Sequence, residues 1–333
     1  MLTQSLSGVW TLDIPGTDYL AVPAQVPGSV YHDLLSAGRI PDPFYRDNEN
    51  RALPLMENEF VYSRPFPVDA EMLACERVLL RCEGLDTLAE IRVNGALLGR
   101  ADNMHRIWEF DAKDALRTGE NRIEVRFGSP TKFIRAAYAA NPADGSSDAM
   151  QGFPLLRKAH CMFGWDWGPR LPDAGIWREI SLIGVCTARI RDVLVLQEHG
   201  ENRVTLRVQS HLERISDGET ALRVTVTGPD GSVFSGAGEN CEIAIDDPQL
   251  WWPAGFGEQP LYTVSVTLAG AEGELDRWER RIGLRAMTVS RRKDKWGESF
   301  CHCVNGVDIF AMGADYIPED NLDRKSTRLN SSH

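Results

Sequence analysis

Ile91-Arg92-Val93-Asn94-Gly95-Ala96-Leu97-Leu98 predicts a β-hairpin, and signals of this kind decide the fold class of the chain. Asn94-Gly95 can supply the two positive φ angles of a type I′ turn, which joins antiparallel strands. Val304-Asn305-Gly306-Val307 repeats the signal, and Pro229-Asp230-Gly231 predicts another turn. The chain therefore reads as a series of antiparallel strands joined by tight turns.

Alternation of apolar and polar residues extends this prediction over much of the sequence. Half-buried strands show this period of two, and it recurs in residues 121–127, 203–209, 222–227 and 261–268. Helices are few. One is expected to follow Ser29 as far as Gly38, and a second is expected at residues 131–140.

Strand spacing suggests two sandwiches with a boundary near Gly184. Residues 187–284 carry short, regular strands over about 100 residues, which is the size of an immunoglobulin-like sandwich. After Arg285 the pattern changes to one hairpin and then an apolar run, Ile309-Phe310-Ala311-Met312-Gly313. This run has the apolar character of a buried strand but nothing in the chain with which to pair fully. We therefore expect it to be the first piece of a further, missing domain and to be exposed here for lack of its partners in that domain.

Composition limits the classes of partner. The chain has 333 residues, so about 150 residues per domain predicts two domains and the start of a third. Its net charge is −12, and negative charge repels phosphate backbones and anionic membranes. We therefore expect no nucleic acid and no membrane as partner.

The cysteines and the N-terminus point to the cytoplasm. Seven cysteines form an odd set without a C-x-x-C pair, which favours free thiols in a reducing compartment. The first ten residues lack the basic start and apolar run of a secretory signal. No stretch approaches the roughly 18 apolar residues of a membrane span.

Chemistry-bearing motifs are mostly absent. The sequence contains no Walker loop, G-x-G-x-x-G, H-E-x-x-H or G-x-S-x-G pattern. In Cys301-His302-Cys303 the two thiols point to opposite sides of a strand, which disfavours a metal site. His160 beside Cys161 is more consistent with a structural role than with a nucleophile and its base. We expect no metal and no cofactor.

Phe163-Gly164-Trp165-Asp166-Trp167-Gly168-Pro169-Arg170 is the best candidate for a binding site. Indole faces stack on the C–H faces of sugar rings, and a carboxylate can accept hydrogen bonds from two neighbouring hydroxyls. The run therefore suits a pyranose. The alternative from the residues alone is packing, because most aromatic clusters belong to a core.

Several segments together resemble the β-mannosidases of glycoside hydrolase family 2, a family that also includes β-galactosidases and β-glucuronidases. The resemblance covers roughly residues 1–322, and its Trp-Asp-Trp-Gly-Pro-Arg run is specific for the β-mannosidase branch. The segments that carry it are residues 10–12, 26–35, 40–45, 84–87, 91–95, 119–121, 157–160, 164–170, 250–253, 281–285, 304–306 and 313–320.

The resemblance implies a mainly β architecture in a fixed order. Residues 1–184 would form a jelly-roll, galactose-binding-like domain, and residues 185–284 an immunoglobulin-like β-sandwich. Residues 285–322 would hold only the first strand region of a truncated (β/α)₈ barrel. Residues 323–333 break with this pattern and look like a translated sequencing adapter, a non-native tail.

The resemblance also implies a site and a reaction. The family releases terminal β-D-mannose from the non-reducing end of β-mannosides with retention, using two barrel glutamates. No residue here matches either glutamate, so we expect no catalytic residue and no turnover by this chain. Trp165 and Asp166 would bind the terminal mannose, and Trp167 and Arg170 would support the loop.

Other readings remain open. The chain could be a stand-alone carbohydrate-binding module, a purely structural pair of sandwiches, or part of a sister family 2 glycosidase such as a β-glucuronidase or an exo-glucosaminidase. The expected partner is a terminal β-mannoside oligosaccharide or glycan. A homodimer of the full-length parent is left open by the sequence.

Overall fold

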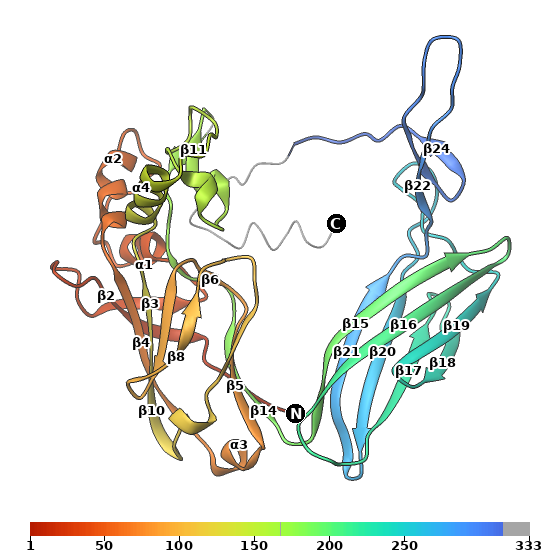
Figure 1. Cartoon of the computed structure of the whole chain (residues 1–333), viewed down its shortest axis with the longest axis horizontal. Coiled ribbons are helices and arrows are strands. Elements are labelled where there is room, and N and C mark those ends of the chain that lie inside the picture. The colour runs from red at the N-terminus through yellow and green to blue at the C-terminus, as the bar shows by residue number, and fades with distance from the viewer. Residues whose placement is uncertain (167, 316–333) are drawn as a thin grey trace. The chain divides into compact units, whose positions relative to one another are not determined.

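A computed structural model describes residues 1–166 and 168–315, in two compact units, Leu2–Gly184 and Val185–Asp315 (Figure 1). Strands dominate both units, as the alternating sequence predicts. Three parts of the chain lie outside the described residues: Trp167, residues 316–322, and the expected adapter-derived tail at 323–333.

The first unit is a sandwich of two antiparallel sheets. The larger sheet has the order β3-β2-β4-β10-β7-β8 and the smaller the order β1-β14-β5-β9. The strands of the larger sheet are β3 (Val22–Val26), β2 (Gly8–Asp13), β4 (Phe60–Val68), β10 (Gly119–Phe127), β7 (Ala89–Val93) and β8 (Ala96–Ala101). Those of the smaller sheet are β1 (Leu2–Ser5), β14 (Ile180–Val185), β5 (Arg77–Cys82) and β9 (Trp108–Asp111).

One apolar core lies between these sheets. Trp10, Tyr62 and Ile123 come from the larger sheet, and Leu80 and Leu182 come from the smaller one. Inward residues alternate with outward polar ones along β7 and β10, as period-two patterning requires. The hairpin predicted at Asn94-Gly95 is confirmed, since both residues have positive φ angles and β7 pairs with β8.

Helices and short strands gather on the connections of this unit. The helix predicted after Ser29 is α1 (Val30–Ser36), and the one predicted at 131–140 is α4 (Pro130–Ala140), capped by the Ser129 hydroxyl. The other helices are α2 (Glu49–Ala52) and α3 (Ala70–Ala74), with 3₁₀ turns η1 (Leu53–Glu57), η2 (Lys113–Ala115), η3 (Phe153–Leu155) and η4 (His160–Met162). Two small ladders pair β11 (Phe163–Trp165) with β12 (Gly168–Arg170), and β13 (Gly175–Ile176) with β6 (Leu85–Asp86).

The second unit contains another sandwich. One sheet is β15-β16-β19 and the other is β18-β17-β20-β21 (Figure 1). Their strands are β15 (Ala188–His199), β16 (Arg203–Arg214), β19 (Asn240–Asp246), β18 (Val233–Ala237), β17 (Ala221–Thr227), β20 (Tyr262–Gly270) and β21 (Gly273–Ile282). Val204, Val224, Ile243 and Val266 meet in the core between the sheets. Among the described residues these are seven strands, the number of a constant-type immunoglobulin sandwich.

The segment that follows leads into the apolar run at 309–313. It forms a three-stranded sheet of β22 (Met287–Ser290), β23 (Cys301–Val304) and β24 (Val307–Ile309). The strand expected at 309–313 is not formed beyond Ile309, where β24 ends, and Phe310 and Met312 are exposed, as expected of a run without its barrel partners. A strand needs a neighbour for its backbone N–H and C=O groups, and none of the described residues pairs with 310–313.

The cysteines also correct an expectation. Cys82, Cys161, Cys241, Cys301 and Cys303 are free, as predicted. Cys75 and Cys186 are disulfide-bonded, so the prediction of free thiols is wrong for these two.

In the part of the chain that the structure describes, no helix combines the length and apolar character that crossing a bilayer requires.

Candidate functional site

The candidate sugar-binding residues lie on the β11–β12 hairpin of the first unit. Phe163 pairs with Arg170, and Trp165 pairs with Gly168. The Trp165 side chain is 43% exposed, which is high for an indole, and Asp166 is exposed in the turn. The structure thus presents Trp165 and Asp166 together at the tip of the hairpin, and Trp167 lies outside the described residues.

Gly164 makes the hairpin conformation possible. Its φ is +89°, a backbone angle that residues with a side chain rarely adopt. A Cβ at this position would also lie 2.4 Å from Cγ of Arg170. The absence of a side chain lets the Arg170 stem cross the backbone of the opposite strand. The hairpin therefore requires glycine at position 164, because only glycine lacks the Cβ atom.

Arg170 ties the hairpin to α2. Its backbone N–H donates to Oε2 of Glu49 at 3.1 Å, and its Nη2 donates to Oε1 at 3.0 Å. The two side chains are 45% and 22% exposed, so water weakens the ion pair and its net free energy is modest. Its value is geometric, because one carboxylate holds both the strand and the guanidinium.

An apolar cluster supports the base of the hairpin. Buried Phe163 packs with Ile134, Phe153 and Leu156. The His160 ring meets Phe153 edge to face at 4.9 Å, and partial burial lowers the pKa of His160. The neutral ring thus serves as a packing group, which accords with the structural role expected of it.

A buried ion pair holds the start and end of the loop that carries the hairpin. The ammonium of Lys158, with no exposed surface, donates to the carboxylate of Asp86 and to the carbonyl of Asp173 at 2.6 Å. The Asp173 carboxylate in turn accepts backbone N–H groups of Tyr31 at 3.1 Å and Ala174 at 2.8 Å. Removing one partner of a buried pair leaves an uncompensated charge, which typically costs about 3–5 kcal/mol.

Sequence reasoning did not single out Lys158 and Asp86. Both stand in segments that carry the family resemblance, residues 157–160 and 84–87, and that was the available signal. Their pairing spans 72 residues and depends on how the two segments meet in the fold.

The hairpin can recognise a polyhydroxylated ring. Trp165 offers an apolar face and Asp166 offers acceptors for neighbouring hydroxyls. Asp166 is the only carboxylate in residues 163–170, whereas retaining hydrolysis needs two about 5 Å apart. Across residues 1–166 and 168–315, no group of three or more His, Cys, Asp or Glu side chains gathers as a metal site would.

Comparisons with known proteins agree with this architecture. Residues 10–178 match the family described as "Glycosyl hydrolase 2 galactose-binding domain-like", and residues 188–285 match "Glycosyl hydrolases family 2". The curated protein "Beta-mannosidase B" of Emericella nidulans is 32% identical over 317 residues. The alignment covers 91% of this chain and 37% of that protein, so the chain spans little more than a third of its relative's length.

Solved structures extend the likeness to three dimensions. A β-D-mannosidase from Dictyoglomus thermophilum superposes with a TM-score of 0.92 and 32% identity, over 99% of this chain and 42% of that one. An exo-chitosanase from Amycolatopsis orientalis has a TM-score of 0.71 at 19% identity, over 96% of this chain and 37% of that one. The second likeness shows the fold alone.

Proposed function

The chain belongs to glycoside hydrolase family 2, and from this premise we propose that it is the N-terminal part of a retaining β-mannosidase. The complete enzyme would release terminal β-D-mannose from the non-reducing end of β-mannosides. The observation that carries the proposal is the exposed Trp165–Asp166 tip on a hairpin held by Gly164, Arg170 and Glu49.

Each residue of the hairpin has a proposed role. Asp166 accepts hydrogen bonds from two hydroxyls of the terminal mannose, and Trp165 forms a wall of the same subsite. Trp167 and Arg170 keep the hairpin in place. A charge-assisted hydrogen bond to a carboxylate contributes about 1.5–3 kcal/mol, so Asp166 would account for much of the sugar recognition on this side.

The bond-breaking groups belong to another part of the protein. A retaining enzyme uses one carboxylic acid to protonate the leaving oxygen and a second carboxylate as nucleophile. Because the chain matches 37% of the relative's length, we assign both groups to the region beyond this match. Residues 1–333 alone would then show no turnover.

The alternatives have less support. Relatives above 30% identity are named β-mannosidases, whereas the β-glucuronidases of Ruminococcus gnavus resemble the chain at only 15–16% identity. A stand-alone carbohydrate-binding module would have to bind sugar through the hairpin without further domains. Binding of mannose by the 333-residue chain that Asp166→Ala abolishes would favour that module.

Kinetics of the full-length gene product test the proposal. We expect hydrolysis of an aryl β-mannoside and none of an aryl β-glucuronide. In the same protein, Asp166→Ala should lower kcat/KM about a hundredfold or more, which corresponds to about 2.7 kcal/mol or more of transition-state stabilisation. Asp114→Ala, another exposed carboxylate of the first unit, is the matched control and should leave kcat/KM unchanged.

Two results would contradict this assignment. Unchanged kinetics in Asp166→Ala would remove Asp166 from the site, and preference for the β-glucuronide would replace the substrate class.

We propose separately that the protein is located in the cytoplasm. Five free cysteines support the reducing cytoplasm, whereas disulfide-bonded Cys75 and Cys186 argue for oxidising conditions. Thiol titration of denatured protein, taken directly from its native compartment under acid quench, decides between them. Seven reactive thiols support the cytoplasm, and five contradict it.

A further inference from the structure

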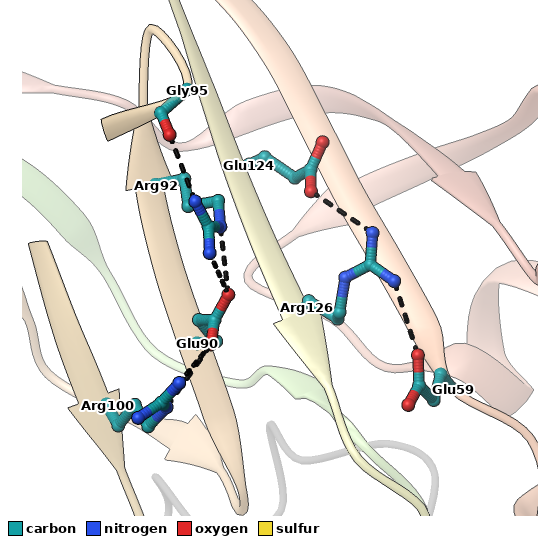
Figure 2. A network of polar contacts seen from close by, with 7 residues as sticks. All are labelled: Glu59, Glu90, Arg92, Gly95, Arg100, Glu124 and Arg126. Atoms are coloured by element: carbon teal, nitrogen blue, oxygen red, sulfur yellow. Dashed lines mark hydrogen bonds and ion pairs between the residues drawn. The ribbon is translucent and has the colours of Figure 1, made fainter. Parts of the chain in front are cut away.

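A row of alternating charges crosses the outer face of the larger sheet in the first unit (Figure 2). Arg126 of β10, Glu90 of β7 and Arg100 of β8 are direct cross-strand neighbours. Glu59 comes just before β4 and continues the row beside Arg126. Successive side chains of a strand point to opposite faces of the sheet. The neighbours Ala89, Ile91 and Phe127 point into the core, so the charged residues of the row point outward.

Ion pairs organise these side chains into two groups. Glu90 accepts from Arg92 Nε at 2.8 Å through Oε1 and from Arg100 Nη2 at 2.9 Å through Oε2. Hydrogen bonds from Arg92 and Arg100 lower the pKa of Glu90, so it stays ionised at neutral pH. Arg126 contacts Glu59 at 3.3 Å and Glu124 at 3.5 Å, as Figure 2 shows.

These pairs leave groups available for a ligand. The Arg100 side chain is 73% exposed and the Glu59 side chain 57% exposed, so their remaining N–H and oxygen atoms face solvent. Exposed pairs contribute little to stability, about 0–1 kcal/mol each. Stability alone is therefore a poor explanation for the four charged side chains of the row, Glu59, Arg126, Glu90 and Arg100.

The row borders a cavity of about 470 Å³. Glu59, Glu90, Arg100 and Arg126 line it, together with Asp102 and Trp108. Small and apolar residues at the strand ends, including Leu88, Ala89, Ala101 and Gly128, complete the lining. Ligand pockets typically have about 300–1,000 Å³, so the volume is sufficient for a small molecule.

Trp108 is held in a fixed orientation at this cavity. Its indole N–H donates to the carbonyl of Asn103 at 3.0 Å, and the Arg106 guanidinium lies 4.7 Å from its ring centroid. The Phe110 ring is parallel to it at 6.2 Å. The indole N–H is thus bonded within the protein, and the half-buried Trp108 is one of the residues that line the cavity.

The balance of charges restricts the ligand. Three lining carboxylates, Glu59, Glu90 and Asp102, accompany two lining guanidiniums, Arg100 and Arg126. The carboxylates repel an anion and the guanidiniums repel a cation. Donors and acceptors beside an aromatic wall instead suit a neutral ring with many hydroxyls.

We propose that this cavity is a second carbohydrate-binding site, which takes a neutral hexopyranose unit of an oligosaccharide. Carboxylates of Glu59 and Glu90 accept hydrogen bonds from hydroxyls, guanidiniums of Arg100 and Arg126 donate to them, and Trp108 packs against the C–H groups. The site uses none of the hairpin residues and needs no turnover. It therefore goes beyond the proposed enzymatic function.

Saturation-transfer NMR with the 333-residue chain and β-1,4-mannobiose tests the proposal. We expect a dissociation constant on the order of 1 mM, equivalent to about 4 kcal/mol. Glu90→Gln and Arg126→Met should each weaken binding about fivefold or more, and Trp108→Ala should abolish it. Thermal unfolding identifies any variant that fails to fold, in which case Arg126→Lys, which keeps the charge and loses the planar fork, replaces it.

Two matched controls make the result specific. Arg207→Met removes a comparable exposed ion-pair residue, partnered by Glu198 and Glu242, from the second unit and should not affect binding. Asp166→Ala should also leave binding intact, which separates this site from the hairpin. The proposal is overturned by absence of binding at about 20 mM sugar, some twenty times the expected constant. It is equally overturned if binding survives all variants of the row, or if Asp166→Ala removes it.

Discussion

Gly164 offers a test of how a single residue sets the shape of the candidate site. At φ +89° an alanine is strained, and its Cβ would lie 2.4 Å from Cγ of Arg170. We expect Gly164→Ala to displace Arg170, loosen its bond to Glu49 and destabilise the unit by about 1–3 kcal/mol. Gly168→Ala is the control, because nothing lies within 4 Å of its Cβ position.

Hydrogen exchange and urea unfolding measure both effects of this change. Amides of residues 163–170 should exchange faster in Gly164→Ala and at the native rate in Gly168→Ala. Equal behaviour of the two variants would mean that the hairpin does not depend on the positive φ of Gly164.

Asp33 makes stability depend on pH. Its buried carboxyl accepts the Gln25 N–H at 2.9 Å and the Tyr62 hydroxyl at 2.8 Å. Burial raises the pKa of Asp33 to about 7, the nearby charge of Asp173 adds to this, and the two hydrogen bonds oppose it. The folded state then retains a proton that the unfolded state, with a pKa near 3.9, releases.

Stability from Asp33 is therefore fully present below about pH 4 and falls as pH rises through about 7. The free energy of unfolding should decrease by about 1 kcal/mol per pH unit between pH 5 and 7, relative to Asp33→Asn. Urea unfolding of both proteins at pH 5, 6, 7 and 8 measures the difference. A difference that stays constant over this range would show that the carboxyl is ionised in the folded protein.

At the scale of elements, local patterns predict well where local causes decide the structure. The hairpin at Asn94-Gly95, the strand at 121–127 and helix α4 all follow from turn chemistry or periodicity within a few residues. Contacts between distant segments were not predicted. Lys158 finds Asp86, and Arg170 finds Glu49, through the packing of loops separated by 72 and 121 residues.

The apolar run at 309–313 likewise depends on contacts with distant segments. Its apolar pattern is real, but a strand also needs a partner, and β24 ends at Ile309. The segment after β21 therefore carries exposed apolar side chains. Four of them are each more than 70% exposed: Trp296, Phe300, Phe310 and Met312. Large apolar side chains that are this exposed can bind other apolar surfaces.

A dye-binding experiment tests this element. The 333-residue chain should bind 8-anilinonaphthalene-1-sulfonate, and the double variant Phe310→Ser/Met312→Ser should lower its fluorescence by about half. Val233→Ser changes an exposed apolar residue of β18 in the same unit and should have little effect. Equal fluorescence of the double variant and the parent chain would show that the dye binds elsewhere.

At the scale of the whole molecule, the two units have separate cores. The core of the first unit draws its residues from Leu6 to Leu182, and the core of the second from Ala188 to Leu284. In the first unit the opening strand β1 pairs with the closing strand β14, from Leu2↔Gly184 to Ser5↔Ser181. A unit whose first and last strands are neighbours in one sheet has no need of sequence beyond them to complete that sheet.

This arrangement predicts that residues 1–187 fold as an independent jelly-roll domain, with both disulfide-bonded cysteines retained. Circular dichroism should show one cooperative thermal transition, and mannobiose should bind at the charged row as in the longer chain. Residues 1–160 lack β11 to β14 and are the control, expected not to fold because β1 and β5 lose their neighbour β14. A non-cooperative melt for 1–187 would mean that the unit needs the following sandwich. The domain boundary near Gly184 would then have to be abandoned as a boundary of folding.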